Sequence, residues 1–305
     1  TSPPGKIRTR GVEPWHQQYW DWKAAGNFTV GGGGAGLFAL ATLTAFYGAS
    51  PFPSAWIGAG MMALGLFFVL LKIGRPLRAV YVLRQPQRSW MSREAWVALF
   101  FFPLALAGMW SDHLPTMIAA ALLAAAFLVC QAMILKEAKA IPAWREVRIV
   151  PLIIATGLVE GAGLVLVAAL FAPLYPWLAK GAATGLGVLL AARYIAWRYY
   201  MRAIRRSGAP QKAVDVLDRS APWFTLFGHV LPLLLLGLGM LIADASAYAA
   251  PLYAAAGLAA FAGGFGFKYL LVTRAGYNQG FALKHTPVRG AGAPGSAVKP
   301  GWLTP

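Results

Sequence analysis

The chain has 305 residues, of which 58% are hydrophobic and 12% are charged, and its formal net charge is +17. A soluble globular domain of ordinary composition is less apolar and more highly charged, so the composition indicates a membrane protein. The positive charge is also typical of nucleic-acid binding. Here, however, the basic residues stand beside apolar runs with no recognition module, so we expect no nucleic-acid partner.

Eight apolar runs are long enough to cross a bilayer core of roughly 30 Å, which predicts an all-α, polytopic fold. Short links between runs alternate with long ones, so the runs pair into four hairpins and we expect two four-helix bundles. The predicted domains are a cytoplasmic segment 1–26, a transmembrane domain 27–273 and a cytoplasmic tail 274–305. The predicted spans are 27–48, 53–73, 94–111, 114–135, 149–171, 176–198, 222–243 and 249–271.

The basic residues predict the orientation. Of the 27, 26 flank one set of helix ends, and only Lys180 lies near the other. Because positively charged loops stay in the cytoplasm, we expect both termini there and a bacterial inner-membrane location. The polar residues 1–26 lack the apolar stretch of a cleavable signal, so the first helix should direct insertion. The basic face should attract anionic lipid, by about 1 kcal/mol per residue, and suits a docked cytoplasmic protein.

The start of the first span combines aromatic residues with glycine. Residues 15–22 read WHQQYWDW, and tryptophan and tyrosine are enriched at membrane interfaces whatever the function. Residues 31–36 read GGGGAG, which lowers helix propensity and predicts that a helix or a flat ligand approaches closely. This run is not a phosphate-binding loop, because it lies inside an apolar span with no preceding strand.

Glu160 lies near the midpoint of the fifth span, in GLVEGAG at residues 157–163. An ionisable group at that depth costs several kcal/mol unless it faces the bundle interior, and the flanking glycines permit close helix approach. Two interpretations stay open. Glu160 is either a neutral interhelical hydrogen-bond donor or part of a proton route or ligand site.

Histidine and cysteine are too few and too scattered to hold a metal. His16 precedes the first span, His113 lies in an outer turn, His285 in the tail, and only His229 lies within a span. A bis-histidine haem needs a pair at similar depth, and the single Cys130 cannot build an iron-sulfur cluster, so we expect neither cofactor in this chain. His229 has two open roles, hydrogen-bonded packing, which is favoured, and a quinone or proton role.

Two stretches resemble a known family. Residues 15–36 and the segment from KIGRPLRA at 72–79 to MSRE at 91–94 resemble the membrane anchors of complex iron-sulfur molybdoenzymes. In the dimethyl sulfoxide reductase anchor family, His-Leu-Gly-x-Pro-x-Arg-Ala closes the second helix and Ser-x-Glu opens the third. Lys72 replaces the histidine of that run. The amino-terminal stretch, together with Lys268, Tyr269 and residues 275–281, AGYNQGF, looks most like the anchors of phenylacetyl-CoA:acceptor oxidoreductases.

The resemblance implies a function and a site. Such anchors, like the related polysulfide reductase anchors, exchange electrons between menaquinone or ubiquinone and an iron-sulfur subunit, which serves a molybdenum or tungsten catalytic subunit. Glu94 would be the catalytic acid. In the alternative, structural role, Glu94 only favours the start of the helix or pairs with Arg93 or Arg88. The predicted quinone site comprises His16, Trp22, Asn27, Lys72, Arg75, Tyr81 and Glu94. A proton route through Glu160 and His229 is predicted from their place within the spans and not from the resemblance.

Two other functions compete with the quinone-exchanging anchor. A secondary transporter would use Glu160 as a midplane site and act without partners. A purely structural anchor would hold no redox site. The anchor hypothesis instead predicts co-purification with an iron-sulfur subunit and a quinone near the cytoplasmic surface.

Overall fold

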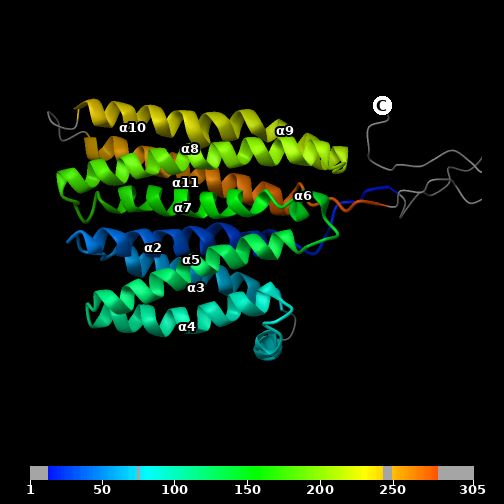
Figure 1. The fold of residues 1–305 in the computed structure, drawn as a ribbon, viewed down its shortest axis with the longest axis horizontal. Coiled ribbons are helices and arrows are strands. Elements are labelled where there is room, and N and C mark those ends of the chain that lie inside the picture. The colour runs from blue at the N-terminus through cyan, green and yellow to red at the C-terminus, as the bar shows by residue number, and fades with distance from the viewer. Residues whose placement is uncertain (1–12, 74–75, 243–248, 281–305) are drawn as a thin grey trace, which may run out of the picture.

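The computed structural model describes residues 13–73, 76–242 and 249–280. Within these residues the chain is helical, apart from one isolated antiparallel β-bridge between His16 and Tyr277. The long helices lie side by side along a common axis (Figure 1). The all-α fold class is therefore confirmed.

Two of the long helices each contain one π-helical turn, and each helix continues without a break on both sides of its turn. The elements in chain order are α1 (Trp22–Gly26), η1 (Asn27–Gly31), α2 (Gly32–Phe46), α3 (Ser54–Leu70), η2 (Pro76–Arg84), α4 (Trp90–Trp110), α5 (Leu114–Lys136), α6 (Pro142–Arg145), α7 (Ile149–Ala168), α8 (Pro176–Arg206), α9 (Gln211–Thr225), η3 (Leu226–Val230), α10 (Leu231–Ile242) and α11 (Ala249–Thr273). Here η1 and η3 are π-helical, and η2 is a 3-10 helix.

Several helices are suited to cross a membrane. Five in the described residues are long and apolar enough, namely Trp22–Phe46, Leu114–Lys136, Ile149–Ala168, Gln211–Ile242 and Ala249–Thr273, and the apolar α3 is shorter. The chain is therefore a multi-pass membrane protein. The remaining predicted spans fall on α3, α4 and α8. The predicted short link near Asp244 lies outside the described residues.

Three helices extend beyond their predicted ends on one side. The first starts at Trp22 because Asp21 caps it, its Oδ1 accepting hydrogen bonds from the amides of Lys23 (3.0 Å) and Ala24 (3.3 Å). α8 continues to Arg206, and the helix that contains α10 already begins at Gln211. Both extensions are polar on one side and buried on the other, so a search for apolar runs does not find them.

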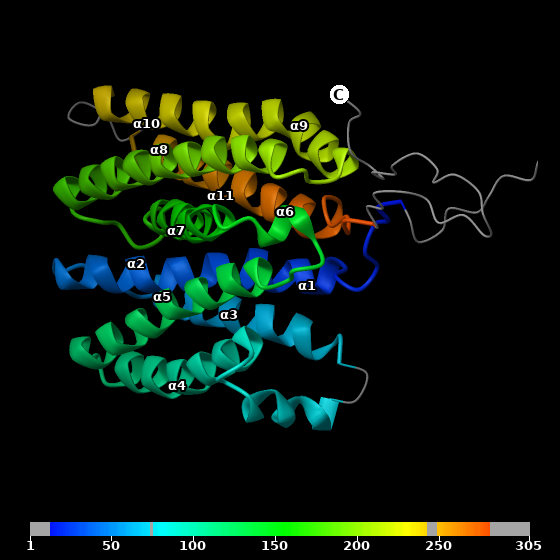
Figure 2. The same ribbon diagram turned by 45° about the vertical axis from the view of Figure 1, so that its right-hand side comes forward.

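Two groups of helices meet at α2 and α7. The side chains of α2 to α5 form one core around Phe38, Phe101 and Phe127, and α7, α8, α10 and α11 enclose another around Leu186 and Leu190. Figures 1 and 2 show α2 and α7 as neighbours between the outer helices.

Glycine makes the contact between the two groups close. A methyl group on Gly36 would lie 2.1 Å from the carbonyl oxygen of Gly157, and one on Gly161 would lie 2.1 Å from the carbonyl carbon of Gly36. The backbones of α2 and α7 are therefore in direct contact, which larger side chains would prevent. The glycine run was expected to approach either a helix or a flat ligand, and in the structure it packs against the helix α7.

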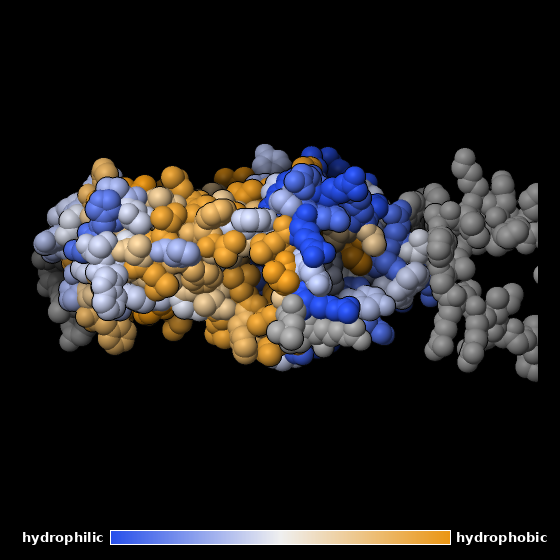
Figure 3. All heavy atoms as spheres, turned by 90° about the horizontal axis from the view of Figure 1, so that it is seen from below, coloured by the Kyte–Doolittle hydropathy of each residue, from blue (hydrophilic) through white to orange (hydrophobic). Residues whose placement is uncertain are grey.

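The two ends of the bundle differ in polarity. On the face drawn in Figure 3, hydrophobic residues cover the middle of the bundle and strongly hydrophilic residues gather at one end. At this end Gln17 N donates to the carbonyl of Gly276 (2.8 Å), and Asn278 N donates to that of Trp15 (3.1 Å). The described residues just before the first helix and just after α11 therefore hydrogen-bond to each other.

Candidate functional site

Glu94 and Asn27 form a buried pair near the polar end of the bundle. Glu94 lies in the second turn of α4, 6% exposed, and Asn27 begins η1, 3% exposed. Asn27 Nδ2 donates a hydrogen bond to Glu94 Oε1 over 3.1 Å. Arg93 is not paired with Glu94, because its guanidinium donates to the carbonyls of Pro86 and Gln87 and lies over the Trp90 ring. Two of the predicted quinone-site residues are therefore in direct contact.

Trp22 and Lys72 lie at the same corner of the bundle, where the first helix begins and α3 ends. Their contacts are with residues other than Glu94. The Trp22 ring packs edge-on against Phe68 of α3, with centroids 5.7 Å apart. Lys72 Nζ lies 3.5 Å from Asp21 Oδ1. Burial tends to raise the pKa of Asp21, but the Ala24 amide, the Lys72 ammonium and the Lys23 amide together hold it below its ordinary value. Lys72 therefore links α3 to the start of the first helix.

The other predicted quinone-site residues do not join this corner. His16 packs against Tyr277, with ring centroids 5.1 Å apart, beyond the end of α11. Tyr81 is 51% exposed on η2, where the Arg84 guanidinium lies 4.1 Å from its ring centroid. Arg75 lies outside the described residues.

Gln131 of α5 connects Asn27 to the membrane interior. It is fully buried, and its Nε2 donates to the backbone carbonyl of Asn27 over 2.7 Å. A methyl group on Gly32 would lie 2.6 Å from Gln131 Oε1 and 2.9 Å from Lys268 Nζ. The amide oxygen and the ammonium therefore both lie beside the bare α-carbon of Gly32, where a larger side chain would displace them.

Glu160 forms an ion pair in the interior. Lys268 Nζ of α11 donates to Glu160 Oε2 of α7 over 2.5 Å, and the two side chains are 1% and 0% exposed. Glycines make room for the carboxyl group, because a methyl on Gly264 would lie 2.7 Å from Oε1 and one on Gly33 would lie 3.3 Å from Oε2. Neither interpretation of Glu160 included a cationic partner, and the structure supplies one in Lys268.

Arg193 brings a second cation to this cluster. It is 0% exposed in α8 and interacts electrostatically with Glu160. Its Nε donates to His229 Nε2 (3.2 Å), and its Nη atoms donate to the carbonyls of Ala260 and Gly228. His229 Nδ1 lies 3.0 Å from the Phe224 carbonyl, so both ring nitrogens have partners and the favoured packing role of His229 fits the geometry.

The π-helical turns support both parts of this network. η1 supplies Asn27 and η3 supplies His229. A π turn shifts the helix register by one residue and leaves backbone groups less regularly bonded, and such turns are frequent at functional sites. The carbonyls of Asn27 and Gly228 in these turns accept from Gln131 and Arg193 respectively.

The sequence analysis missed three members of the network. Lys268 and Arg193 had been counted among the surface cations at one end, and this count was wrong for both, because the structure buries them. Both lie inside predicted spans, where a charged residue needs a partner, and that signal could have paired them with Glu160. Gln131 is an amide in an otherwise apolar run, which is the same kind of signal.

Comparison with protein-family models and with curated proteins found no match to this chain. The functional proposal therefore rests on the resemblance described in the sequence and on the geometry of the chain's own residues.

These residues can exchange a proton and accept hydrogen bonds from a ligand or water. Glu94 can give or take a proton close to the polar end, and its partner Asn27 is neutral. Asn27 Oδ1, Gln131 Oε1 and Glu160 Oε1 are buried acceptors for which the described residues provide no hydrogen-bond donor. Buried acceptors are normally satisfied, so donors such as water or a ligand hydroxyl fit along this line.

Proposed function

We propose that this chain is the membrane anchor and quinone-exchange subunit of a complex iron-sulfur molybdoenzyme in a bacterial inner membrane. It would pass electrons between menaquinone or ubiquinone and an iron-sulfur subunit docked on its basic cytoplasmic face. The eight predicted spans would form two four-helix bundles, with both termini cytoplasmic. The molybdenum or tungsten catalytic subunit would act on a cytoplasmic substrate, an acyl-CoA such as phenylacetyl-CoA.

The observation that carries this proposal is the buried Asn27–Glu94 pair near the polar end of the bundle. Electron tunnelling falls steeply with distance, so a quinone served by an external iron-sulfur subunit must bind near the end at which that subunit docks. A quinone accepts two electrons and two protons when it is reduced. Glu94 is a carboxyl group near that end and can supply one of the protons.

The residues at this corner fit a quinone headgroup. Asn27 Oδ1 is a buried acceptor without a donor among the described residues, which suits a quinol hydroxyl group. Trp22, half-exposed beside Phe68, offers an aromatic face at the membrane interface. Asn27 and Glu94 would hold the headgroup, and Lys72, tied to Asp21, would keep the ends of the first two spans together.

The test is Glu94→Gln in the assembled complex. We expect quinone-linked turnover to fall by about tenfold or more, because the variant cannot transfer a proton. Activity with an artificial soluble dye, which bypasses the quinone, should stay at the wild-type level.

Glu146→Gln is the matched control. Glu146 is a carboxyl group at the same end of the bundle, where it pairs with Arg148 at 2.8 Å, and its loss should leave quinone-linked turnover unchanged. Unchanged turnover in Glu94→Gln, or an equal fall in dye-linked activity, would contradict the proposed site.

The orientation has its own test. Reporter fusions to the amino and carboxy ends should both read cytoplasmic, because basic residues flank one set of helix ends. A periplasmic signal from either fusion contradicts the proposed topology.

One observation favours a secondary transporter as the second candidate. The buried Glu160–Lys268 pair with Arg193 would suit a substrate or proton site inside the membrane. This alternative requires the purified chain alone to move a solute or protons across a vesicle membrane, with Glu160→Gln abolishing the movement. A purely structural anchor requires both glutamates to be dispensable for turnover of the complex.

A further inference from the structure

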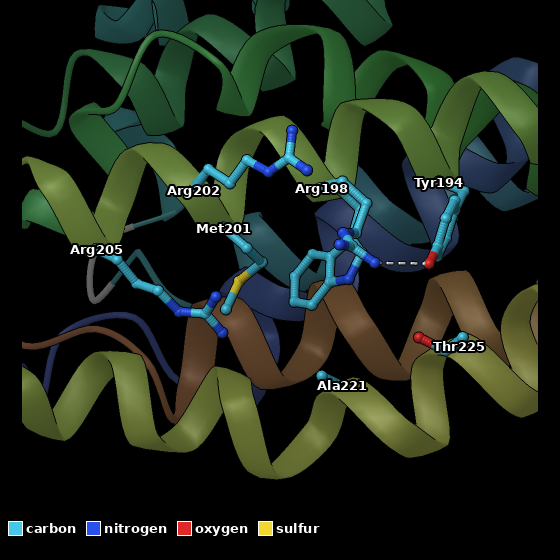
Figure 4. A pocket seen from close by; sticks show the side chains of 8 residues that line it. Tyr194, Arg198, Met201, Arg202, Arg205, Ala221 and Thr225 are labelled. Atoms are coloured by element: carbon cyan, nitrogen blue, oxygen red, sulfur yellow. Dashed lines mark hydrogen bonds between the residues drawn. The ribbon is translucent and has the colours of Figure 1, made fainter.

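A basic groove lies between α8 and α9 at the polar end of the bundle, away from Glu94 and Glu160. Two adjoining cavities, of about 310 and 510 Å³, share Tyr194, Arg198, Arg205, Ala221 and Thr225 as lining residues, so they form one groove. Figure 4 shows the arginines coming from successive turns of α8, with Ala221 and Thr225 on the facing helix. Tyr194, Arg198, Arg202 and Arg205 follow a spacing that places them on one face of α8.

The groove carries surplus positive charge. Arg205 pairs with Asp218 of α9 at 2.5 Å, which compensates one of the three cations. Arg198 donates to the neutral Tyr194 hydroxyl over 3.0 Å. Arg202 is exposed and has no ion-pair partner within the described part of the chain. Two guanidinium groups are thus available for an anion, and guanidinium is the side chain that best matches the geometry of a phosphate.

The polarity of the groove changes along its length. α8 ends and α9 begins at the polar end of the bundle, so Arg205 and Asp218 lie outermost and Tyr194 and Thr225 lie deeper. Beyond them the groove continues over Leu226 and Val230, which are 50% and 40% exposed. A free phosphate would use only the outer part. A glycerophospholipid has both a phosphate and acyl chains, and it matches the whole groove.

We propose that this groove binds one anionic glycerophospholipid, with its phosphate at Arg198 and Arg202 and an acyl chain along Leu226 and Val230. The buried Trp197 and Met201 form the floor below the phosphate. Such a lipid would join α8 to α9 at the point where the chain turns between them. The proposal does not depend on the quinone function.

The experiment measures binding of a fluorescent phosphatidylglycerol to the purified full chain in neutral detergent. We expect the double variant Arg198→Gln/Arg202→Gln to weaken the affinity by about tenfold or more, because two charge-assisted contacts are lost. Ala221→Phe should weaken it as well, since this variant keeps every arginine and fills the groove. Phosphatidylglycerol should raise the unfolding temperature of the wild type, and phosphatidylcholine should not.

The control is Arg84→Gln/Lys139→Gln, which removes the same charge from the same end of the bundle and leaves the groove intact. An equal loss of affinity in this control would mean diffuse attraction to the basic face and would overturn the proposal. So would competition by inorganic phosphate at the lipid's own concentration, which indicates a free-phosphate site. Unchanged lipid binding in the groove variants, with loss of a co-purifying protein, would assign the groove to a protein partner instead.

Discussion

The buried carboxyl groups of Glu94 and Glu160 differ in the charge of the groups around them. Glu94 lies near the polar end of the bundle, and its hydrogen-bond donors are the neutral side-chain amides of Asn27 and Gln131. Glu160 lies deeper, paired with the Lys268 ammonium and influenced by the Arg193 guanidinium. If all three groups are ionised, the inner cluster holds one surplus positive charge, whereas the outer pair holds no cation.

This difference separates structural from chemical roles. Removing a carboxylate held by two buried cations is costly, because both cations would be left uncompensated. A carboxyl group with an amide partner can change its protonation state and keep its hydrogen bond. We therefore infer that Glu160 fixes the packing of α7, α8 and α11, and that Glu94 is the group able to exchange a proton with a ligand.

The largest expected effect follows from removing the inner charge. Glu160→Gln should reduce the free energy of unfolding by about 3–5 kcal/mol, because it leaves Lys268 and Arg193 buried without a carboxylate. Lys268→Met should cost less, since Arg193 still compensates Glu160. The double variant Glu160→Gln/Lys268→Met should be more stable than Glu160→Gln alone. Unfolding midpoints in detergent measure all three.

Glu146→Gln is the matched control for that series. It breaks the pair with Arg148, which is partly exposed to solvent, and such pairs contribute about 1 kcal/mol or less. A Glu160→Gln protein as stable as this control would remove the distinction drawn between the two carboxyl groups.

Gly32→Ala tests whether the two regions are connected. The added methyl group would lie within 2.9 Å of both Gln131 Oε1 and Lys268 Nζ, so one of them must move. We expect a loss of about 1–3 kcal/mol in the free energy of unfolding. Gly60→Ala is the control, because nothing lies within 4 Å of a methyl group there. Equal stability of the two variants would mean that the side chains yield freely at Gly32.

The smallest expected effect on stability is that of Glu94→Gln. The glutamine Oε1 can still accept from Asn27 Nδ2, and no buried cation loses its partner, so unfolding should change by under about 1 kcal/mol. The same chemical substitution should thus be mild at Glu94 and severe at Glu160. A severe loss of stability at Glu94 would show that it too is held by a charge, and would count against its role as the exchangeable acid.

Part of the candidate site could be predicted from sequence. The resemblance assigns Glu94 and Asn27 to one site, and the two side chains are in contact. His16 was assigned to the same site, but it packs beside Tyr277. Sequence distance from a helix end does not fix direction, and the chain before Trp22 runs toward the end of α11.

The sequence alone determined the all-helical class and the membrane setting, because apolar length and charge placement are local properties of the chain. It also indicated close approach at the glycine run, since bare backbone there lowers helix propensity. Only the tertiary structure decided which helix approaches, how Gln131 reaches Asn27, and that Lys268 and Arg193 turn inward to Glu160. These depend on helix rotation and on which helices become neighbours, and an all-round apolar helix carries little periodic signal to specify either.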